Sequence, residues 1–178
     1  REGHKYNFPS PFFMFVGSLL PRRQVAAVIQ ALGKLPPHYH FVVVGEPRVD
    51  RQRELREVSV VRGVADRVHI LGHISDGDLE GLYTQTCALI SPSTYEGFGL
   101  PVLEAMTRGV PVIAWDIPVM REVTGGAGTL VPVGDVNALA AAMHMVASED
   151  EKRNKVIQEG KEQAKKFSWR RSGEKFLE

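Results

Sequence analysis

The 178-residue sequence has little cysteine, no excess of either charge and no long hydrophobic run, and each shortage excludes a class of protein. One cysteine, Cys87, cannot form an intramolecular disulfide, so a disulfide-stapled scaffold is excluded and a reducing cytoplasmic setting is expected. Lys and Arg number 22 against 21 Asp and Glu, so net charge gives no reason to expect binding to nucleic acid or to an anionic membrane. No apolar run approaches the roughly 20 residues that span a bilayer, and no signal peptide is evident.

The residues that are present have the composition of a globular domain. Apolar residues make up 43% of the chain and charged residues 24%, which is enough to fill one sizeable core. The six histidines are scattered without metal-ligand spacing, so no metal site is expected. The start of the chain is polar and contains proline, as linkers between domains often do. Residues 1–10 are therefore interpreted as the remnant of an interdomain linker and residues 11–178 as the domain itself.

Six short apolar runs rich in β-branched residues alternate with longer segments of helical periodicity. The runs predict buried strands at 12–18, 40–45, 67–73, 88–93, 111–116 and 128–133. The periodic segments predict helices at 22–35, 51–64, 75–87, 100–109, 135–147 and about 150–166. This alternation predicts an α/β fold with a Rossmann-like, doubly wound, parallel six-stranded sheet. If the strand order is the common 3-2-1-4-5-6, ligands bind beyond the ends of strands one and four.

The loop after the fourth predicted strand, "STYEGFGLPVLEAM", has the features of an anion site. Pro101 suits the first position of a helix, which we expect over about 101–108. Gly97 and Gly99 precede that helix and allow a ligand to approach the backbone closely. The backbone N–H groups of residues 98–100, added to the helix dipole, then predict a phosphate site.

Two glutamates in the same stretch indicate that the ligand also offers hydroxyl groups. Glu96 and Glu104 would repel a bare phosphate, but an ionised carboxylate accepts hydrogen bonds from both hydroxyls of a diol. A sugar nucleotide has one diol on its ribose and another on its sugar, with a diphosphate between them. The alternative is that Glu96 only complements the helix dipole and that Glu104 is a solvated surface residue.

The loop after the first predicted strand, "GSLLPRRQ", contains positive charge in an unfavourable place. If Pro21 begins a helix, Arg22 and Arg23 lie in its first turn and oppose the dipole by roughly 0.3 to 1 kcal/mol each. An anionic ligand would compensate, whereas the alternative is that both side chains point into solvent. Gly17 and Ser18 offer close backbone approach and a hydroxyl to the same anion. The G-x-G-x-x-G fingerprint of dinucleotide-binding proteins is absent.

Together these residues resemble a known family. "LISPSTYEGFGLPVLEAMTRGVPVIAWD" is similar to the donor-binding motif of the retaining GT-B glycosyltransferases of family GT4, in which seven residues separate two glutamates. The resemblance extends to "FVGSLLPRRQ", "VVVG", "RVHILGHISDGDLEGLY", "REVTGGAGTLVPVGDVNALAAAM" and "FSWRR", in the family's order and spacing. It implies that the chain is the C-terminal half of a GT-B fold, the domain that binds the nucleotide-sugar donor.

The resemblance also implies a role for each candidate residue. Glu104 is expected to bind the ribose diol and Glu96 the donor sugar, while Arg23 binds the diphosphate where relatives usually have lysine. The expected backbone contacts to phosphates and sugar come from Gly97, Phe98, Gly99 and Leu100. Arg23 and Glu96 are the expected catalytic residues.

Other positions of the resemblance concern the edges of the donor site. Arg22, Gly17 and Ser18 are expected to contact the donor, and Ser18 stands where some relatives carry a second phosphate-binding arginine. The loop that begins at His73 and Ile74 is expected to lie near the base.

The implied activity is transfer of a sugar from a nucleotide diphosphate sugar without a metal ion or cofactor. Mannose is slightly favoured, so the expected substrate is GDP-mannose, with a UDP-sugar as the alternative. The expected partner is an N-terminal acceptor-binding domain, without which the chain should bind donor but be largely inactive. Three alternatives stay open: a regulatory module that senses nucleotide sugars, half of a GT-B sugar-nucleotide epimerase, and a generic α/β domain that binds no nucleotide.

Overall fold

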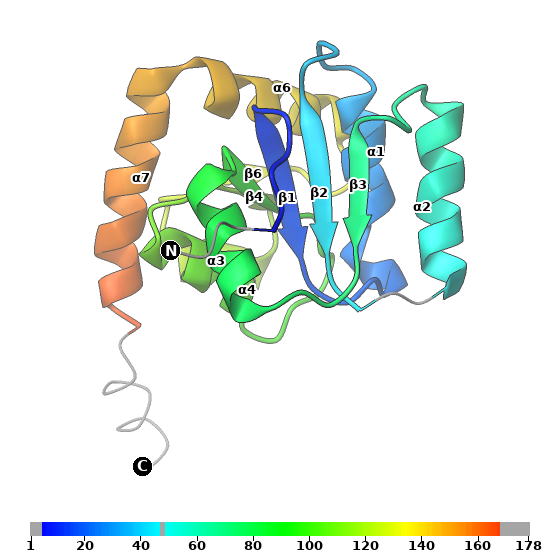
Figure 1. Ribbon diagram of the computed structural model, residues 1–178. Coiled ribbons are helices and arrows are strands. Elements are labelled where there is room, and N and C mark those ends of the chain that lie inside the picture. Colours follow the sequence, from blue (N-terminus) through cyan, green and yellow to red (C-terminus); the bar gives the residue numbers. More distant parts are fainter. Residues whose placement is uncertain (1–4, 47–48, 168–178) are drawn as a thin grey trace.

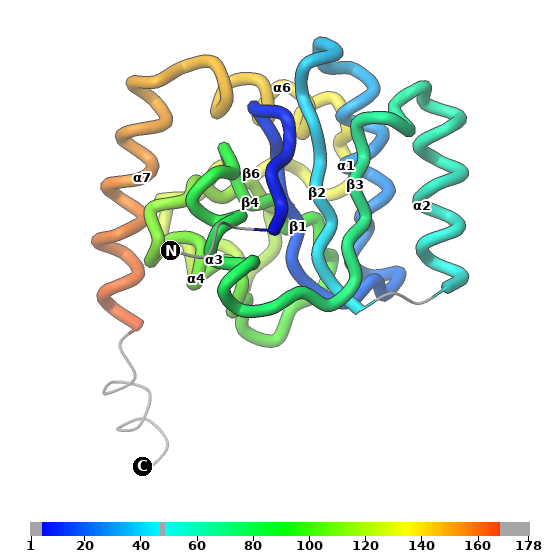
Figure 2. The backbone as a smooth tube through the Cα atoms, viewed as in Figure 1, coloured from blue at the N-terminus to red at the C-terminus, as the bar shows by residue number. Residues whose placement is uncertain are grey.

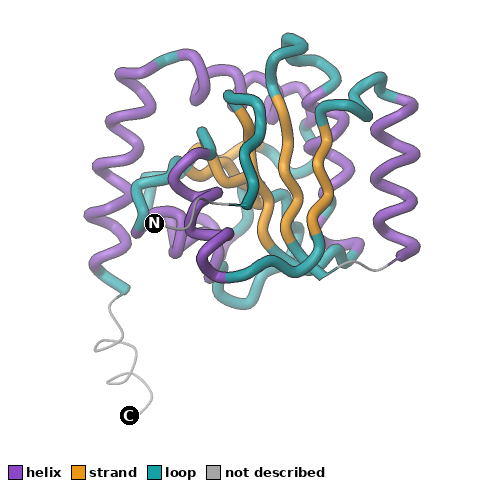
Figure 3. Tube along the Cα trace, in the orientation of Figure 1, coloured by secondary structure: helices purple, strands orange, loops and turns teal. Residues whose placement is uncertain are grey.

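The computed structural model describes residues 5–46 and 49–167, and within them a parallel sheet lies between helices on both faces (Figures 1 and 3). The strands are β1 Phe12–Val16, β2 His40–Val44, β3 Val68–Leu71, β4 Ala88–Ser91, β5 Val112–Trp115 and β6 Thr129–Val131. The helices are α1 Val25–Leu32, α2 Val49–Val61, α3 Asp76–Gln85, α4 Leu100–Thr107, α5 Pro118–Thr124, α6 Val136–Ser148 and α7 Asp150–Lys165. A short 3-10 turn, η1 Pro21–Arg23, precedes α1.

The strand order is β3-β2-β1-β4-β5-β6, with every pair parallel, which confirms the predicted doubly wound sheet. Met14 of β1 pairs with Val42 on one side and with Leu89 of β4 on the other. The strand order therefore reverses between β1 and β4. The loops that follow β1, β2 and β3 leave the same edge of the sheet, where such folds bind ligands (Figure 2).

The sheet is buried on both faces, which explains why its strands read as continuous apolar runs rather than alternating ones. All four residues of β4 and of β5 are buried, as are Phe41, Val42, Val43 and Val44 of β2. Helix α1 packs between α2 and α6, and α7 packs on α4 and α5. These helical layers hold the strand ends, and hence the loops, in fixed positions.

Two local predictions are wrong. The helix expected from residue 22 begins only at Val25, because Gln24 adopts a left-handed conformation with φ of 45° and ends the preceding turn. Pro21 does begin a helical turn that includes Arg22 and Arg23, but this turn is the 3-10 element η1 and not the first turn of α1. Helix α5 was not expected at all, although Pro118 at its start and Gly125 at its end, with φ of 54°, are ordinary helix signals.

The segment that precedes β1 packs on the domain in its described part, from residue 5 onward. Phe8 lies against Phe12 and His69, with ring centroids 6.0 and 4.7 Å apart, and Tyr6 stacks on Phe8. Its interpretation as a linker remnant stays a prediction. The expected "FSWRR" similarity lies mostly outside the described residues, which end at Phe167.

Phe8 covers a pair of histidines on neighbouring strands. Nδ1 of His40 lies 3.1 Å from Nε2 of His69, and the two rings are stacked. Burial is the main cause that lowers the pKa of each ring. The charge of Arg67 lowers the pKa of His40 further, and the charge of His40 lowers the pKa of His69 further. Asp66 acts in the opposite direction on both pKa values without reversing them. The folded protein therefore resists protonation of this pair.

This pair predicts a loss of stability in mild acid. In the unfolded chain both histidines take up protons near pH 6.5, whereas in the folded protein they do so only at lower pH. As the pH falls through about 6.5, the unfolded state therefore takes up protons that the folded state does not yet bind. The free energy of unfolding consequently falls as the pH falls. Urea unfolding at pH 7.5, 6.5 and 5.5 should show this decrease in the free energy of unfolding, and His69→Gln should make the decrease smaller. The same dependence of unfolding free energy on pH in wild type and in His69→Gln would contradict the prediction. The control is His38→Gln, which replaces an exposed ring.

Candidate functional site

The loops after β1 and β4 are joined by hydrogen bonds. Thr94 donates to the carbonyl oxygen of Arg22 from its backbone N, at 2.9 Å, and from its Oγ1, at 3.2 Å. Arg22 returns a bond from Nη1 to the carbonyl oxygen of Tyr95 at 2.9 Å, and its guanidinium lies 5.9 Å from the centre of the Tyr95 ring. Two segments about 70 residues apart in sequence thus form one unit at the point where the strand order reverses.

The predicted residues Arg23 and Glu96 meet at this junction. Nη1 of Arg23 forms an ion pair with Oε1 of Glu96, and the two side chains are 14% and 9% exposed. The same nitrogen donates to Oγ of the fully buried Ser93 at 3.3 Å. Nε of Arg23 is buried and has no partner among the described residues. Burial, and then the charge of Arg22, lower the pKa of Arg23. The site thus holds a guanidinium with one unused donor.

The backbone around Arg23 is held by the next residue along the chain. The side-chain carbonyl Oε1 of Gln24 accepts a hydrogen bond of 2.9 Å from Nε1 of Trp115, which is fully buried at the end of β5. This bond fixes Gln24 in its left-handed conformation, which is uncommon for a residue other than glycine. The Arg23 side chain is thereby positioned toward the loop after β4.

Helix α4 begins next to this ion pair, at Leu100. Gly99 is its N-cap with φ of 77°, and its carbonyl oxygen accepts from the N–H groups of Val102 and Leu103 at 3.0 and 3.1 Å. Pro101 is the second helical residue. Within the described chain, no backbone carbonyl accepts from the N–H groups of residues 97–99. These N–H groups and the positive end of the helix dipole are free to bind an anion.

Glu104 is exposed on α4 and makes no contact with the Arg23–Glu96 pair among the described residues. Its backbone carbonyl accepts from Nη1 of Arg108 at 3.1 Å. Tyr83 of α3 is close enough that the charge of Glu104 adds to the effect of burial in raising the pKa of the Tyr83 hydroxyl. Glu104 thus takes no part in the ion pair of Glu96 with Arg23, and its ribose role stays a prediction.

A pocket of about 270 Å³ lies at the carboxyl ends of β1, β2 and β3. It brings together three predicted donor residues, Gly17, Ser18 and Ile74. It is lined by Val16, Gly17, Ser18, Val44, Gly45, Glu46, His73, Ile74, Asp76 and Leu79. Glu46 and Asp76 were not predicted as site residues, although Glu46 follows β2, which neighbours β1, and Asp76 begins α3, which follows β3. The strand order was the signal that could have found them.

The floor of this pocket depends on a close approach of two glycines. The N–H of Gly17 donates to the carbonyl oxygen of Val44 at 2.9 Å, which continues the β1–β2 pairing beyond the strands. A Cβ on Gly45 would lie 1.8 Å from the carbonyl oxygen of Gly17, far inside van der Waals contact. Gly17 itself has φ of 149°, a value that side chains disfavour. Only glycine at residue 45 allows this close approach of the ends of β1 and β2.

Gly45→Ala should therefore destabilise the domain. The added methyl group forces the ends of β1 and β2 apart, and such overpacking costs about 1–3 kcal/mol of unfolding free energy. Urea denaturation measures the loss. Gly77→Ala in α3 is the matched control, because its nearest neighbour would be 4.0 Å away and alanine is favoured in helices. The same loss in both variants would contradict the expected clash.

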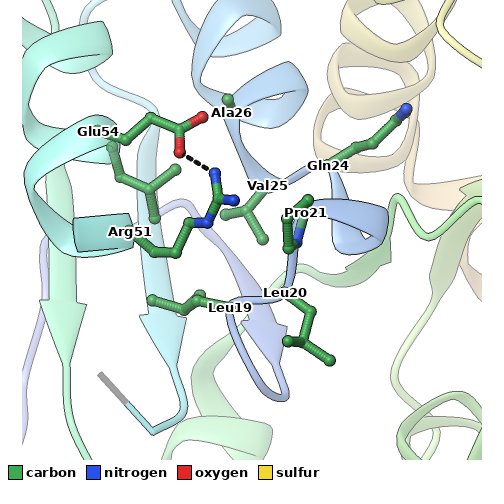
Figure 4. A pocket seen from close by; sticks show the side chains of 9 residues that line it. Leu19, Leu20, Pro21, Gln24, Val25, Ala26, Arg51 and Glu54 are labelled. Atoms are coloured by element: carbon green, nitrogen blue, oxygen red, sulfur yellow. Dashed lines mark hydrogen bonds and ion pairs between the residues drawn. The ribbon is translucent and has the colours of Figure 1, made fainter. Parts of the chain in front are cut away.

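Two other hollows are poorer candidates for a ligand site. One of about 40 Å³ lies between α2 and the loop after β1, where Nη1 of Arg51 donates to Glu54 at 2.5 Å (Figure 4). That volume holds little more than water. A wider and more open hollow of about 450 Å³ is lined by residues 125–127 and by the face of α7 around Gln163. It includes no residue of the loops after β1 and β4, so its size does not make it the better candidate.

No cluster of three or more His, Cys, Asp or Glu side chains in the described part of the chain could hold a metal ion. Among the described helices, none combines the length and apolar character that crossing a bilayer requires.

Comparison with known proteins now assigns the family. The family model for glycosyl transferases group 1 matches residues 1–163. The chain belongs to this family. It is 33% identical over 163 residues to O-antigen chain mannosyltransferase B of Escherichia coli, covering 89% of this chain and 42% of the relative. This group 1 chain therefore spans less than half the length of that relative.

Solved structures agree with the family assignment. The C-terminal domain of a glycosyl transferase group 1 family protein from Francisella tularensis has a TM-score of 0.78 and 25% identity, covering 88% of this chain and 85% of that domain. HepE of Anabaena in complex with UDP-glucose has a TM-score of 0.81 and 25% identity, covering 87% of this chain and 44% of HepE. These matches confirm the family and the Rossmann-like, GT-B-type fold that the sequence predicted.

Proposed function

We propose that this domain binds the nucleotide-sugar donor of a retaining glycosyltransferase, with GDP-mannose as the favoured donor. The observation on which this rests is the contact between Arg23 and Glu96 where the strand order reverses. A cation suited to a diphosphate and a carboxylate suited to sugar hydroxyls lie together there. The start of α4, with its free N–H groups, is adjacent.

The parts of the donor can be assigned to the parts of this site. The pocket beside Gly17 and Ile74 is close to the lower end of small-ligand pockets, about 300 Å³, and suits the base. The diphosphate binds Arg23 and the N–H groups of residues 97–100, and the sugar then lies against Glu96. Glu104, on the exposed side of α4, is the proposed ligand of the ribose diol.

In the proposed reaction, the bond between the anomeric carbon and the β-phosphate oxygen breaks. A bond forms from an acceptor oxygen to the same carbon, with retention of configuration, and the proton of the acceptor hydroxyl passes to the departing phosphate oxygen and from there to solvent. Negative charge develops on the departing diphosphate. The Arg23 guanidinium and the N–H groups at the start of α4 are fixed in place before the reaction, so they stabilise this charge without a metal ion.

The acceptor and the remaining catalytic groups are proposed to come from a second domain. The lengths of similar proteins support this proposal. This chain aligns with only 42% of the E. coli mannosyltransferase but with 85% of a solved C-terminal domain. The isolated chain should therefore bind donor but transfer it poorly. The mannosyltransferase relative supports mannose, while the UDP-glucose complex of HepE keeps UDP-sugars as the second choice. The single cysteine supports the proposed cytoplasmic setting.

Nucleotide binding should raise the thermal stability of the isolated domain. Ligand at 100 times its Kd adds about 2.7 kcal/mol, which is roughly 5 to 10 °C in melting temperature at this chain length. We expect a shift with GDP and GDP-mannose, and a smaller one with UDP and UDP-glucose. Arg23→Ala should abolish it.

The control for this panel is Arg53→Ala, which removes an exposed arginine of α2 that pairs with Glu57 at 3.8 Å. It should leave the nucleotide shift unchanged. A shift that survives in Arg23→Ala would show that the nucleotide binds elsewhere. The absence of any shift in the wild-type domain would contradict the proposed donor site.

A further inference from the structure

The ion pair at the centre of the site also bears on which nucleotide the site prefers. We infer that Glu96 makes the site favour the intact nucleotide sugar over the nucleoside diphosphate that remains after transfer. This inference rests on the proposed function, because it assumes that a diphosphate binds Arg23. It assigns to Glu96 a selectivity between substrate and product that is separate from its contact with the sugar.

The geometry leaves an anion at Arg23 no way to avoid Glu96. The carboxylate already contacts the guanidinium through Nη1, and both side chains are largely removed from water. The buried hydroxyl of Ser93 accepts from the same nitrogen and fixes the guanidinium plane. A phosphate group must therefore use another nitrogen of the guanidinium. It then lies a few ångströms from a negative charge that water screens poorly.

Substrate and product differ in the charge that they place there. In a nucleotide sugar the β-phosphate is joined to the α-phosphate by an anhydride bond and to the sugar by an ester bond, so it has one ionisable oxygen. After the sugar leaves, that phosphate is terminal, and with a second pKa near 6 it carries close to one additional negative charge at neutral pH. Repulsion by Glu96 is therefore larger for the product than for the donor. The donor's repulsion is also offset by its sugar hydroxyls, which can donate to the carboxylate.

Among the described residues, Glu96 is the carboxylate that forms an ion pair with Arg23. Glu104 is exposed and makes no contact with Arg23. The nearby Arg22 donates to the carbonyl oxygen of Tyr95, and no ion pair joins it to Glu96 among the described residues. Because Glu96 contacts the guanidinium that would bind the diphosphate, it penalises the more negative ligand. Product release is thereby favoured after each transfer.

Isothermal titration of GDP and GDP-mannose, and of UDP and UDP-glucose, into wild type and Glu96→Gln tests the inference. The glutamine keeps the size of the side chain and a hydrogen-bond acceptor but removes the charge. For the pair that wild type binds, the ratio of the diphosphate Kd to the nucleotide-sugar Kd should fall by about tenfold, or 1.4 kcal/mol. The diphosphate should bind more tightly and the nucleotide sugar more weakly.

Two further variants separate charge from packing. Glu96→Asp keeps the charge and should retain most of the wild-type ratio. Glu57→Gln breaks the exposed Arg53–Glu57 pair of α2 and should leave the ratio unchanged. If Glu96 only orients Arg23, both affinities of Glu96→Gln fall by the same factor and the ratio stays constant, which would overturn the inference. If wild type binds none of the four ligands, the proposed function fails and the inference fails with it.

Discussion

The connection between the loops after β1 and β4 is the constraint on which the rest of the site depends. Neither loop alone contains both charges of the site, and the Thr94–Arg22 and Arg22–Tyr95 hydrogen bonds hold them in register. The connection is possible because β1 and β4 are neighbours in the sheet although 71 residues separate Val16 from Ala88. Burial of the sheet between two helical layers makes that neighbourhood rigid.

The two opposite charges at this junction stabilise one another. Burying either Arg23 or Glu96 alone would cost several kcal/mol, whereas together they neutralise one another. The pair still leaves Nε of Arg23 unsatisfied, and an unpaired buried donor has a cost that a ligand can remove. The site is thus stable without a ligand yet complete only with an anion. The proposed binding and release of a diphosphate rest on this arrangement.

The sequence predicted much of this because periodicity and strand order are local or rule-based properties. Apolar runs located all six strands, and the doubly wound order placed Arg23 and Glu96 at one crevice before any contact was known. The conformation of Gln24 could not be predicted in the same way, because its bond to Trp115 joins residues 91 positions apart. Helix α5 was missed since seven residues give too little periodicity. The exposure of Glu104 and the approach of Gly45 to Gly17 depend on packing between elements that periodicity does not describe.

The central claim is that a nucleotide sugar binds at the meeting point of these two loops. Amide chemical-shift mapping of the ¹⁵N-labelled domain during titration with GDP-mannose tests it most directly. The account predicts that the largest changes occur at Gly17, Ser18, Gly97 and Gly99. Changes confined to residues 125–127 and to α7, or the absence of changes at saturating ligand, would contradict it.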